Sequence, residues 1–358
     1  MPSPIPALAR TLSNVFRGLG YEVDMLPWGS CGPGERRTSK IVRALSDALA
    51  VRRRLATGRY GLLYVHTAHS WNSVLRDLLL LVSTASSGCS AVLHFHGSRV
   101  VSMRLAESRL FCELSRSLVS WADAIAVLSK NEELAWHREC PETAVFVVRN
   151  PYEGSDKTTE LLLTPAPSYD RLKLLFVGRV GEKKGAYDLL KAMAVLRDSH
   201  GLHLELDACG EVLEPARWKK LIVAYDLVSV VTTHGRLTRP ELDEYYAAAD
   251  VLVLPSHGEG FPTVVLEAMS ANLPVIVSAV GGVVDIMSDG IDGLLVEPGD
   301  VSDLVRALLR ISQDRSLSRV LAGGGRATLC QFSPDSVSPT YARLLKFALE
   351  SSKPQRVE

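Results

Sequence analysis

Short apolar runs alternate with longer segments of helical spacing along most of this chain, and no other feature restricts the possible folds as much. Apolar runs bounded by turn residues are typical of buried strands, and apolar residues three and four apart are typical of helices. Regular alternation of the two predicts an α/β fold with parallel sheets covered by helices. Ligands of such sheets bind at the carboxyl ends of the strands. Strands are expected at residues 21–26, 62–66, 91–96, 124–129, 144–148, 172–177, 202–208, 228–233, 251–254, 274–278 and 294–296, and the first helices at 7–19, 39–56, 73–83 and 102–120.

The alternation is interrupted once, by a segment rich in Pro, Ser, Thr and Asp that begins at Asn150. A chain of 358 residues exceeds one ordinary core, so two domains are expected. We predict two doubly wound Rossmann-like domains that face a cleft. The first covers residues 1–151 and is completed by a C-terminal helix at 333–358, a linker covers 152–170, and the second domain covers 171–332.

Charge and composition exclude several classes of protein. With 47% apolar and 22% charged residues, the chain has the composition of a globular protein. Lys plus Arg equals Asp plus Glu, at 40 each, which argues against a nucleic-acid-binding protein. Residues 1–150 hold 18 basic and 12 acidic residues, so the first part carries +6 and the remainder −6. This asymmetry predicts peripheral contact of the first domain with an anionic membrane or an anionic acceptor, although a solvated basic helix face is the simpler alternative.

The sequence predicts a cytoplasmic location, with any membrane contact at the inner face. The longest apolar run, at residues 77–82, is too short to span a bilayer, and no signal peptide is recognised. The six cysteines have no CxxC spacing, which is typical of reduced thiols.

Residues 257–269 carry the clearest binding signal. The stretch follows an apolar strand, turns through glycines that include Gly260, and enters a helix with Pro262 near its first position. Backbone N–H groups at a helix start favour an anion or a ring of hydroxyls. Glu259 and Glu267 can face the same side, and two carboxylate acceptors at that separation suit a sugar joined to a ribose. A surface turn with solvated acids is the alternative.

A second glycine-rich turn, at residues 178–185, adds positive charge. Arg179 offers a fork of donors, Lys184 a point charge and Gly178 access to the backbone. Together these groups can clamp a diphosphate. Basic residues in such a loop are also often only solvated.

These motifs together resemble the nucleotide-sugar domain of retaining glycosyltransferases of the GT-B fold, in family four (glycosyl transferases group 1). The resemblance covers residues 172 to about 330, and His94-Phe95-His96-Gly97 and Asn150-Pro151 continue it in the first half. The family normally opens with a strand and a glycine-rich loop before the helix expected at 7–19, so the first sheet is expected to lack its first strand. Further matching motifs lie at residues 122–124, 129, 176–179, 184–185, 249–256, 259–267, 274–278, 281–282 and 289–300.

The resemblance implies that the donor is a nucleoside-diphosphate sugar. Arg179 and Lys184 would hold its diphosphate, Glu267 its ribose hydroxyls and Glu259 hydroxyls of the transferred sugar. The donor site would also include Gly178 and the backbone N–H groups of Gly260 and Phe261.

The resemblance also implies a mechanism and an acceptor. The catalytic residues would be His96, which would face the reaction centre across the cleft, with Glu259, Lys184 and Arg179. Transfer would retain the anomeric configuration, and the leaving phosphate would take the acceptor proton. No metal or other cofactor is expected, because Arg and Lys neutralise the diphosphate. The acceptor would be a glycan or a lipid-linked saccharide in cell-surface polysaccharide or glycoconjugate synthesis.

Two other functions remain open. His94 and His96 alternate on a strand and share a face, as ligands of a metal-dependent hydrolase do, with His66 or His69 as the third ligand. A catalytically silent sugar-nucleotide-binding or scaffold protein is the other alternative, which the expected loss of the first strand favours.

Overall fold

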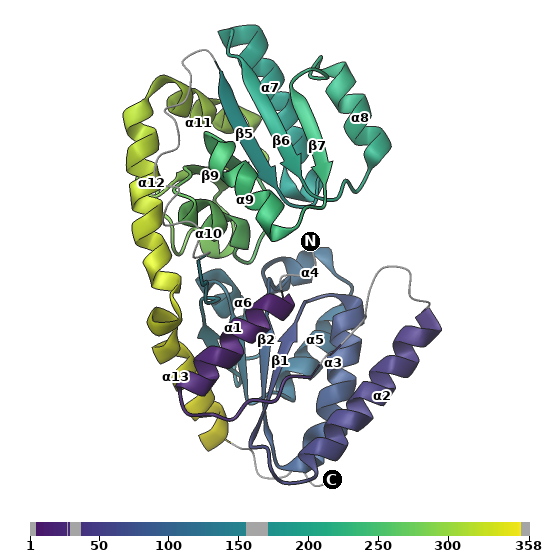
Figure 1. The fold of residues 1–358 in the computed structure, drawn as a ribbon. Helices are drawn as coiled ribbons and strands as arrows, with labels where there is room; N and C mark the ends of the chain where they lie inside the picture. Colours follow the sequence, from purple (N-terminus) through teal and green to yellow (C-terminus); the bar gives the residue numbers. More distant parts are fainter. Residues whose placement is uncertain (1–4, 27, 29–36, 155–170, 352–358) are drawn as a thin grey trace. The chain divides into compact units, whose positions relative to one another are not determined.

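The structure is a computed structural model that describes residues 5–26, 28, 37–154 and 171–351. The chain divides into two compact units (Figure 1). The first unit contains Ile5–Pro151 and the C-terminal segment from Pro334, and the second unit contains Tyr152–Ser333. The linker expected at 152–170 lies, apart from its first three residues, outside the described residues.

The first unit is built on a four-stranded parallel sheet of order β1-β2-β3-β4. Strand β2 is buried along its whole length, and its alternate residues face opposite sides of the sheet, as the pleat of a strand requires. Val92 packs on one side with residues of α1 and α13, whereas Leu93 packs on the other with residues of α2, α3, α5 and α6. The strands are β1 (Leu62–Thr67), β2 (Ser90–Phe95), β3 (Ala124–Val127) and β4 (Ala144–Val147). The helices are α1 (Ile5–Gly18), α2 (Arg37–Leu55), α3 (Trp71–Thr84), α4 (Met103–Ala106), α5 (Arg109–Ser120), α6 (Lys130–Glu139) and α13 (Pro334–Glu350).

Helix α13 returns to the first unit and lies beside α1 (Figure 1). Its residues at positions three and four apart, including Tyr341, Leu344 and Leu345, are fully or almost fully buried. They form one core with Phe16 of α1 and the sheet residue Val92. This amphipathic stripe stabilises the unit by burying an apolar face of the helix that water would otherwise contact.

The second unit contains a six-stranded parallel sheet of order β10-β9-β8-β5-β6-β7. The chain first extends this sheet from β5 through β6 to β7, and then returns to the other side of β5 with β8. The connections therefore reverse direction between β5 and β8, and a crevice opens at the carboxyl ends of the two strands at such a point. The strands are β5 (Leu172–Val177), β6 (Leu204–Cys209), β7 (Val231–Gly235), β8 (Val251–Leu254), β9 (Val275–Ser278) and β10 (Leu294–Val296). The helices are α7 (Ala186–His200), α8 (Pro215–Ala224), α9 (Arg239–Ala248), α10 (Thr263–Ser270), α11 (Val301–Gln313) and α12 (Arg315–Leu329).

Two expectations from the sequence are wrong. Residues 21–26 are not a strand: the Val23 carbonyl accepts a hydrogen bond from the Arg17 guanidinium at 3.1 Å, and Met25 is exposed. The single helix expected at 102–120 is broken between α4 and α5, because Ser108 caps a new helix with its hydroxyl and leaves the helical conformation. Within the described part of the chain, no helix is both long and apolar enough to cross a bilayer.

Candidate functional site

The loops that follow β5 and β8 contact each other directly at the crevice of the second sheet. The backbone N–H of His257 donates to the carbonyl of Lys183 at 3.0 Å. Gly185 has a positive φ of 68°, and a Cβ atom at this position would lie 1.9 Å from the Pro255 carbonyl oxygen. Only glycine allows both the left-handed backbone and this close approach. The glycine that ends the basic turn therefore fixes the two loops against each other.

This contact brings together Lys184 and Glu259, which form an ion pair although 75 residues separate them. The Ser256 hydroxyl also donates to the Glu259 carboxylate, at 2.9 Å. The Lys184 side chain is 23% exposed and that of Glu259 13%, so both charges are shielded from bulk water but remain accessible. Salt screens a partly buried pair less than a surface pair. The crevice thus holds one cation for an anionic group beside one acceptor for hydroxyls.

A third loop fixes the backbone around Glu259. The N–H of Gly282, just after β9, donates to the Gly260 carbonyl at 2.6 Å. Gly281 has a φ of 54°, and a Cβ atom there would lie 1.9 Å from the Glu259 carbonyl oxygen. The N–H groups of Gly260 and Phe261, by contrast, donate to no partner within the described ranges. These two donors are available to a ligand.

Glu267, on α10, is held by two residues that lie outside the motifs predicted from the sequence. The Tyr246 hydroxyl donates to one carboxylate oxygen at 2.8 Å, and Arg239 lies 3.1 Å from the other. Burial and then the Glu267 charge raise the pKa of Tyr246, so this hydroxyl stays a donor. Arg239 and Tyr246 are seven residues apart on α9, and this spacing places them on the same face of the helix. This seven-residue spacing is visible in the sequence, but it does not reveal that the shared partner, Glu267, lies on another helix.

Two other predicted donor-site residues, Gly178 and Arg179, directly follow β5 at the same end of the sheet. A Cβ atom on Gly210 would lie 1.8 Å from the Gly178 carbonyl oxygen, so this turn packs tightly against the end of β6. Arg179 is exposed. None of the hydrogen bonds or ion pairs found in the described part of the chain connects it to the Lys184–Glu259 pair.

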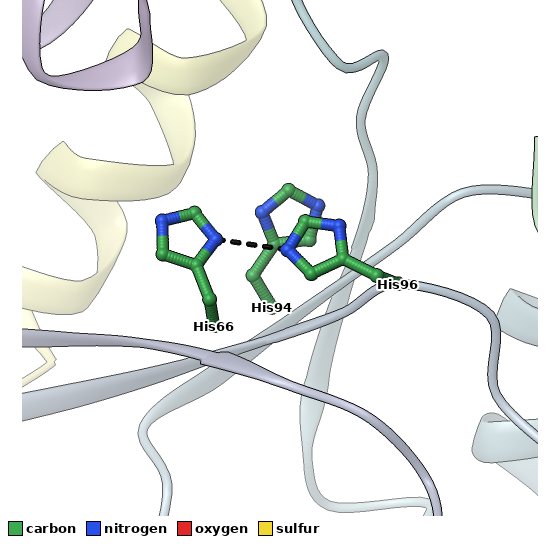
Figure 2. A group of neighbouring side chains, drawn as sticks. All are labelled: His66, His94 and His96. Atoms are coloured by element: carbon green, nitrogen blue, oxygen red, sulfur yellow. Dashed lines mark hydrogen bonds between the residues drawn. The ribbon is translucent and has the colours of Figure 1, made fainter. Parts of the chain in front are cut away.

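His96 belongs to the first unit, where it lies in a cluster with His66 and His94 (Figure 2). Strands β1 and β2 pair in register, with His66 opposite His94. His66 Nδ1 lies 2.8 Å from His96 Nε2. Burial lowers the pKa of His66 to about 4, and burial together with the neighbouring His66 lowers that of His96 to about 3. Both imidazoles are therefore neutral at pH 7.

The other proposed third ligand, His69, does not join this cluster. Its two ring nitrogens lie 3.2 Å from the Ser98 hydroxyl and 2.9 Å from the Ser115 hydroxyl. Among the described residues, the cluster of possible metal ligands consists of His66, His94 and His96 alone. It lacks the carboxylate that a hydrolytic metal site commonly adds.

The fold of the chain matches that of known structures. Sucrose-phosphate synthase from Thermosynechococcus elongatus superposes with a TM-score of 0.75 at 23% identity, over 94% of this chain and 92% of that chain. The Anabaena protein Alr3699/HepE, solved in complex with UDP-glucose, superposes with a TM-score of 0.68 at 18% identity, over 84% and 82%. The predicted fold class, α/β with two Rossmann-like domains of the GT-B type, is confirmed.

Sequence comparison then relates the second half of the chain to a known family. Residues 165–328 match the model of the family described as Glycosyl transferases group 1. D-inositol 3-phosphate glycosyltransferase of Thermomonospora curvata is 27% identical over 285 residues, which cover 76% of this chain and 63% of that protein. The chain spans between about a third and two thirds of the length of the curated relatives it matches.

Proposed function

We propose that the protein is a glycosyltransferase that takes a sugar from a nucleoside-diphosphate sugar. The observation that carries this proposal is the Lys184–Glu259 ion pair at the β5/β8 crevice, beside the free N–H groups of Gly260 and Phe261. A cation, a carboxylate and free amides in one crevice match the phosphates and hydroxyls of such a donor. The family match over residues 165–328 and the UDP-glucose bound to the Anabaena neighbour support the same ligand class.

In the proposed donor complex, Lys184 exchanges its contact with Glu259 for the donor diphosphate, and Arg179 binds the same group. Glu259 is then free to accept hydrogen bonds from the transferred sugar. Glu267, fixed by Arg239 and Tyr246, accepts from the ribose hydroxyls. Because two cationic side chains neutralise the leaving diphosphate, the proposed reaction at this site uses no divalent metal.

We assign the acceptor to the first unit, with His96 beside it. The acceptor is proposed to be a glycan or a lipid-linked saccharide in the synthesis of cell-surface polysaccharide or glycoconjugate. Its hydroxyl attacks on the face that the diphosphate leaves, a phosphate oxygen takes the proton, and the configuration at the anomeric carbon is retained. His96 is neutral at pH 7 because burial lowers its pKa to about 3, so it acts as a hydrogen-bonding partner rather than as a charge.

The exposed face of α2 favours peripheral contact of this unit with the cytoplasmic face of a membrane. Val42, Leu45 and Leu49 are 65%, 46% and 51% exposed and lie three and four residues apart. The helix ends in the exposed residues Arg52, Arg53 and Arg54. An apolar stripe next to basic residues is typical of helices that lie in the interface of an anionic bilayer. Flotation of the protein with anionic and with neutral vesicles tests this, and equal recovery with both would contradict it.

The proposed activity is tested first by donor binding and then by turnover. Thermal unfolding is measured with UDP, GDP, ADP and dTDP and their sugars, in the presence of a chelator, since a ligand of the folded state raises the Tm. The donor that raises the Tm is then used in a transfer assay that detects release of the nucleoside diphosphate.

Lys184→Ala should lower donor affinity about 10- to 100-fold, because a hydrogen bond to a charged group contributes roughly 1.5–3 kcal/mol. Lys183→Ala is the matched control, since Lys183 is exposed and its described contact uses only the backbone carbonyl. Equal turnover by both variants and the parent would place the donor elsewhere.

A further inference from the structure

The three histidines of the first unit come together because of the sheet register. His66 lies on β1 and His94 opposite it on β2, while His96 follows two residues later on the same face. One ring nitrogen of each lies within 4.8 Å of the other two. Figure 2 shows the three rings gathered together, with a hydrogen bond that joins His66 directly to His96. Three nitrogen donors at this separation can contact one ion after small rotations of the rings.

The hydrogen bonding of His94 leaves one nitrogen unused. Its Nε2 is buried and has no hydrogen-bond partner within the described part of the chain. Leaving a buried polar atom unpaired costs about 1–3 kcal/mol. Its Nδ1 lies 3.0 Å from the Tyr64 hydroxyl. Histidines that bind metals hold an oxygen with the other ring nitrogen in this way, which fixes the orientation of the ring.

His66 and His96 complete the donor set. They share one hydrogen across 2.8 Å, between Nδ1 of His66 and Nε2 of His96. A metal ion placed between them takes both lone pairs, and the shared hydrogen moves to the far nitrogen of its own ring. All three imidazoles remain neutral, which is the form that binds metals. Their burial already favours this form at pH 7.

We propose that His66, His94 and His96 form a site for one divalent transition-metal ion of the zinc type, and that the bound ion inhibits sugar transfer by occupying His96. Imidazole donors suit Zn²⁺, Cu²⁺ and Ni²⁺, whereas Mg²⁺ prefers oxygen ligands. Three histidines leave a fourth position of a tetrahedral ion to water. The inhibition rests on the proposed function of His96, but the metal site itself does not.

The site is tested by direct binding to the full chain after treatment with a chelator. Zn²⁺ is titrated in competition with a chromophoric chelator, and the expected result is one ion per chain and no competition from Mg²⁺. His66→Asn should weaken Zn²⁺ binding by more than about 100-fold, because the loss of an outer partner alone costs 10–100-fold. His137→Asn is the matched control, an exposed histidine on α6 of the same unit, and should bind as the parent does.

Co²⁺ provides an independent readout, because its visible spectrum distinguishes nitrogen ligands from cysteine sulfur. Equal Zn²⁺ affinity of the parent and His66→Asn, or a sulfur charge-transfer band, would overturn the metal site. Thermal unfolding first establishes that His66→Asn is folded. If it is not, His96→Asn replaces it in the binding experiment alone.

Inhibition is measured as turnover with increasing Zn²⁺, relative to the activity of the same variant without the ion. The parent and His137→Asn should lose activity over the Zn²⁺ concentrations at which the site fills, whereas His66→Asn should keep its activity at these concentrations. Tight binding without inhibition would refute inhibition through His96. Absence of transfer by the metal-free parent with every donor would instead refute the proposed function, and the binding result would stand unaffected.

Discussion

The buried imidazoles make the stability of the first unit sensitive to mild acid. The pKa of His66 is lowered to about 4 by burial, against 6.5 in an unfolded chain. Between these two pH values the unfolded state binds a proton that the folded state does not, so the free energy of unfolding falls as the pH falls. Each pH unit corresponds to about 1.36 kcal/mol. At pH 5 the expected loss for this one residue is therefore about 2 kcal/mol.

The neighbouring histidines act in the same direction. Burial lowers the pKa of His96 to about 3 and, together with Arg99, that of His69 to about 4. Burial and the neighbouring imidazoles of His96 and His66 also hold the pKa of His94 well below its usual range. Glu132 acts in the opposite direction, because burial raises its pKa and the folded state then binds the extra proton. The pH dependence of the free energy of unfolding of one protein sums these opposing contributions, so a comparison of variants isolates the contribution of His66.

The assay is urea unfolding at pH 7, 6 and 5, followed by tryptophan fluorescence. Four of the five tryptophans, Trp28, Trp71, Trp121 and Trp136, lie in the first unit, so the signal reports mainly on it. His66→Asn should lose about 2 kcal/mol less stability than the parent between pH 7 and pH 5, and His137→Asn should behave as the parent. An equal pH dependence in all three proteins would refute a neutral, buried His66.

Three further perturbations have expected outcomes that follow from particular contacts. Gly281→Ala should weaken donor binding in a calorimetric titration. The new Cβ atom would lie only 1.9 Å from the Glu259 carbonyl oxygen and would force that carbonyl to move. Unchanged affinity would contradict the proposed role of this turn. Tyr246→Phe should lower donor affinity about 3- to 10-fold, because one oxygen of Glu267 loses a hydrogen bond that contributes roughly 0.5–1.5 kcal/mol. An affinity equal to that of the parent would show that this contact does not position the carboxylate. Leu344→Ala should lower the free energy of unfolding by about 2–5 kcal/mol in urea, since the side chain is fully buried, and a change below 1 kcal/mol would show that α13 does not complete this core.

Much of the fold follows from local sequence, because strands and helices depend on the spacing of apolar residues along the chain. The runs at 172–177 and 251–254 are strands with these same bounds. The run at 21–26 was also expected to be a strand but remains outside the sheet, since a strand also needs a neighbour whose backbone groups are free to pair. Local pattern cannot supply that information.

By itself the sequence determined the two alternating halves, the glycine-bearing turns and the chemical types of Lys184, Glu259 and His96. Only the tertiary structure decided which of them meet. The Lys184–Glu259 pair depends on β8 returning beside β5, and the contact of His66 with His96 depends on the register of β1 and β2. Partners at such separations are set by chain topology and by close backbone contacts, which leave no periodic signal in the sequence. The sequence therefore predicts which residue types could contact a ligand, whereas it does not predict the groups that they form.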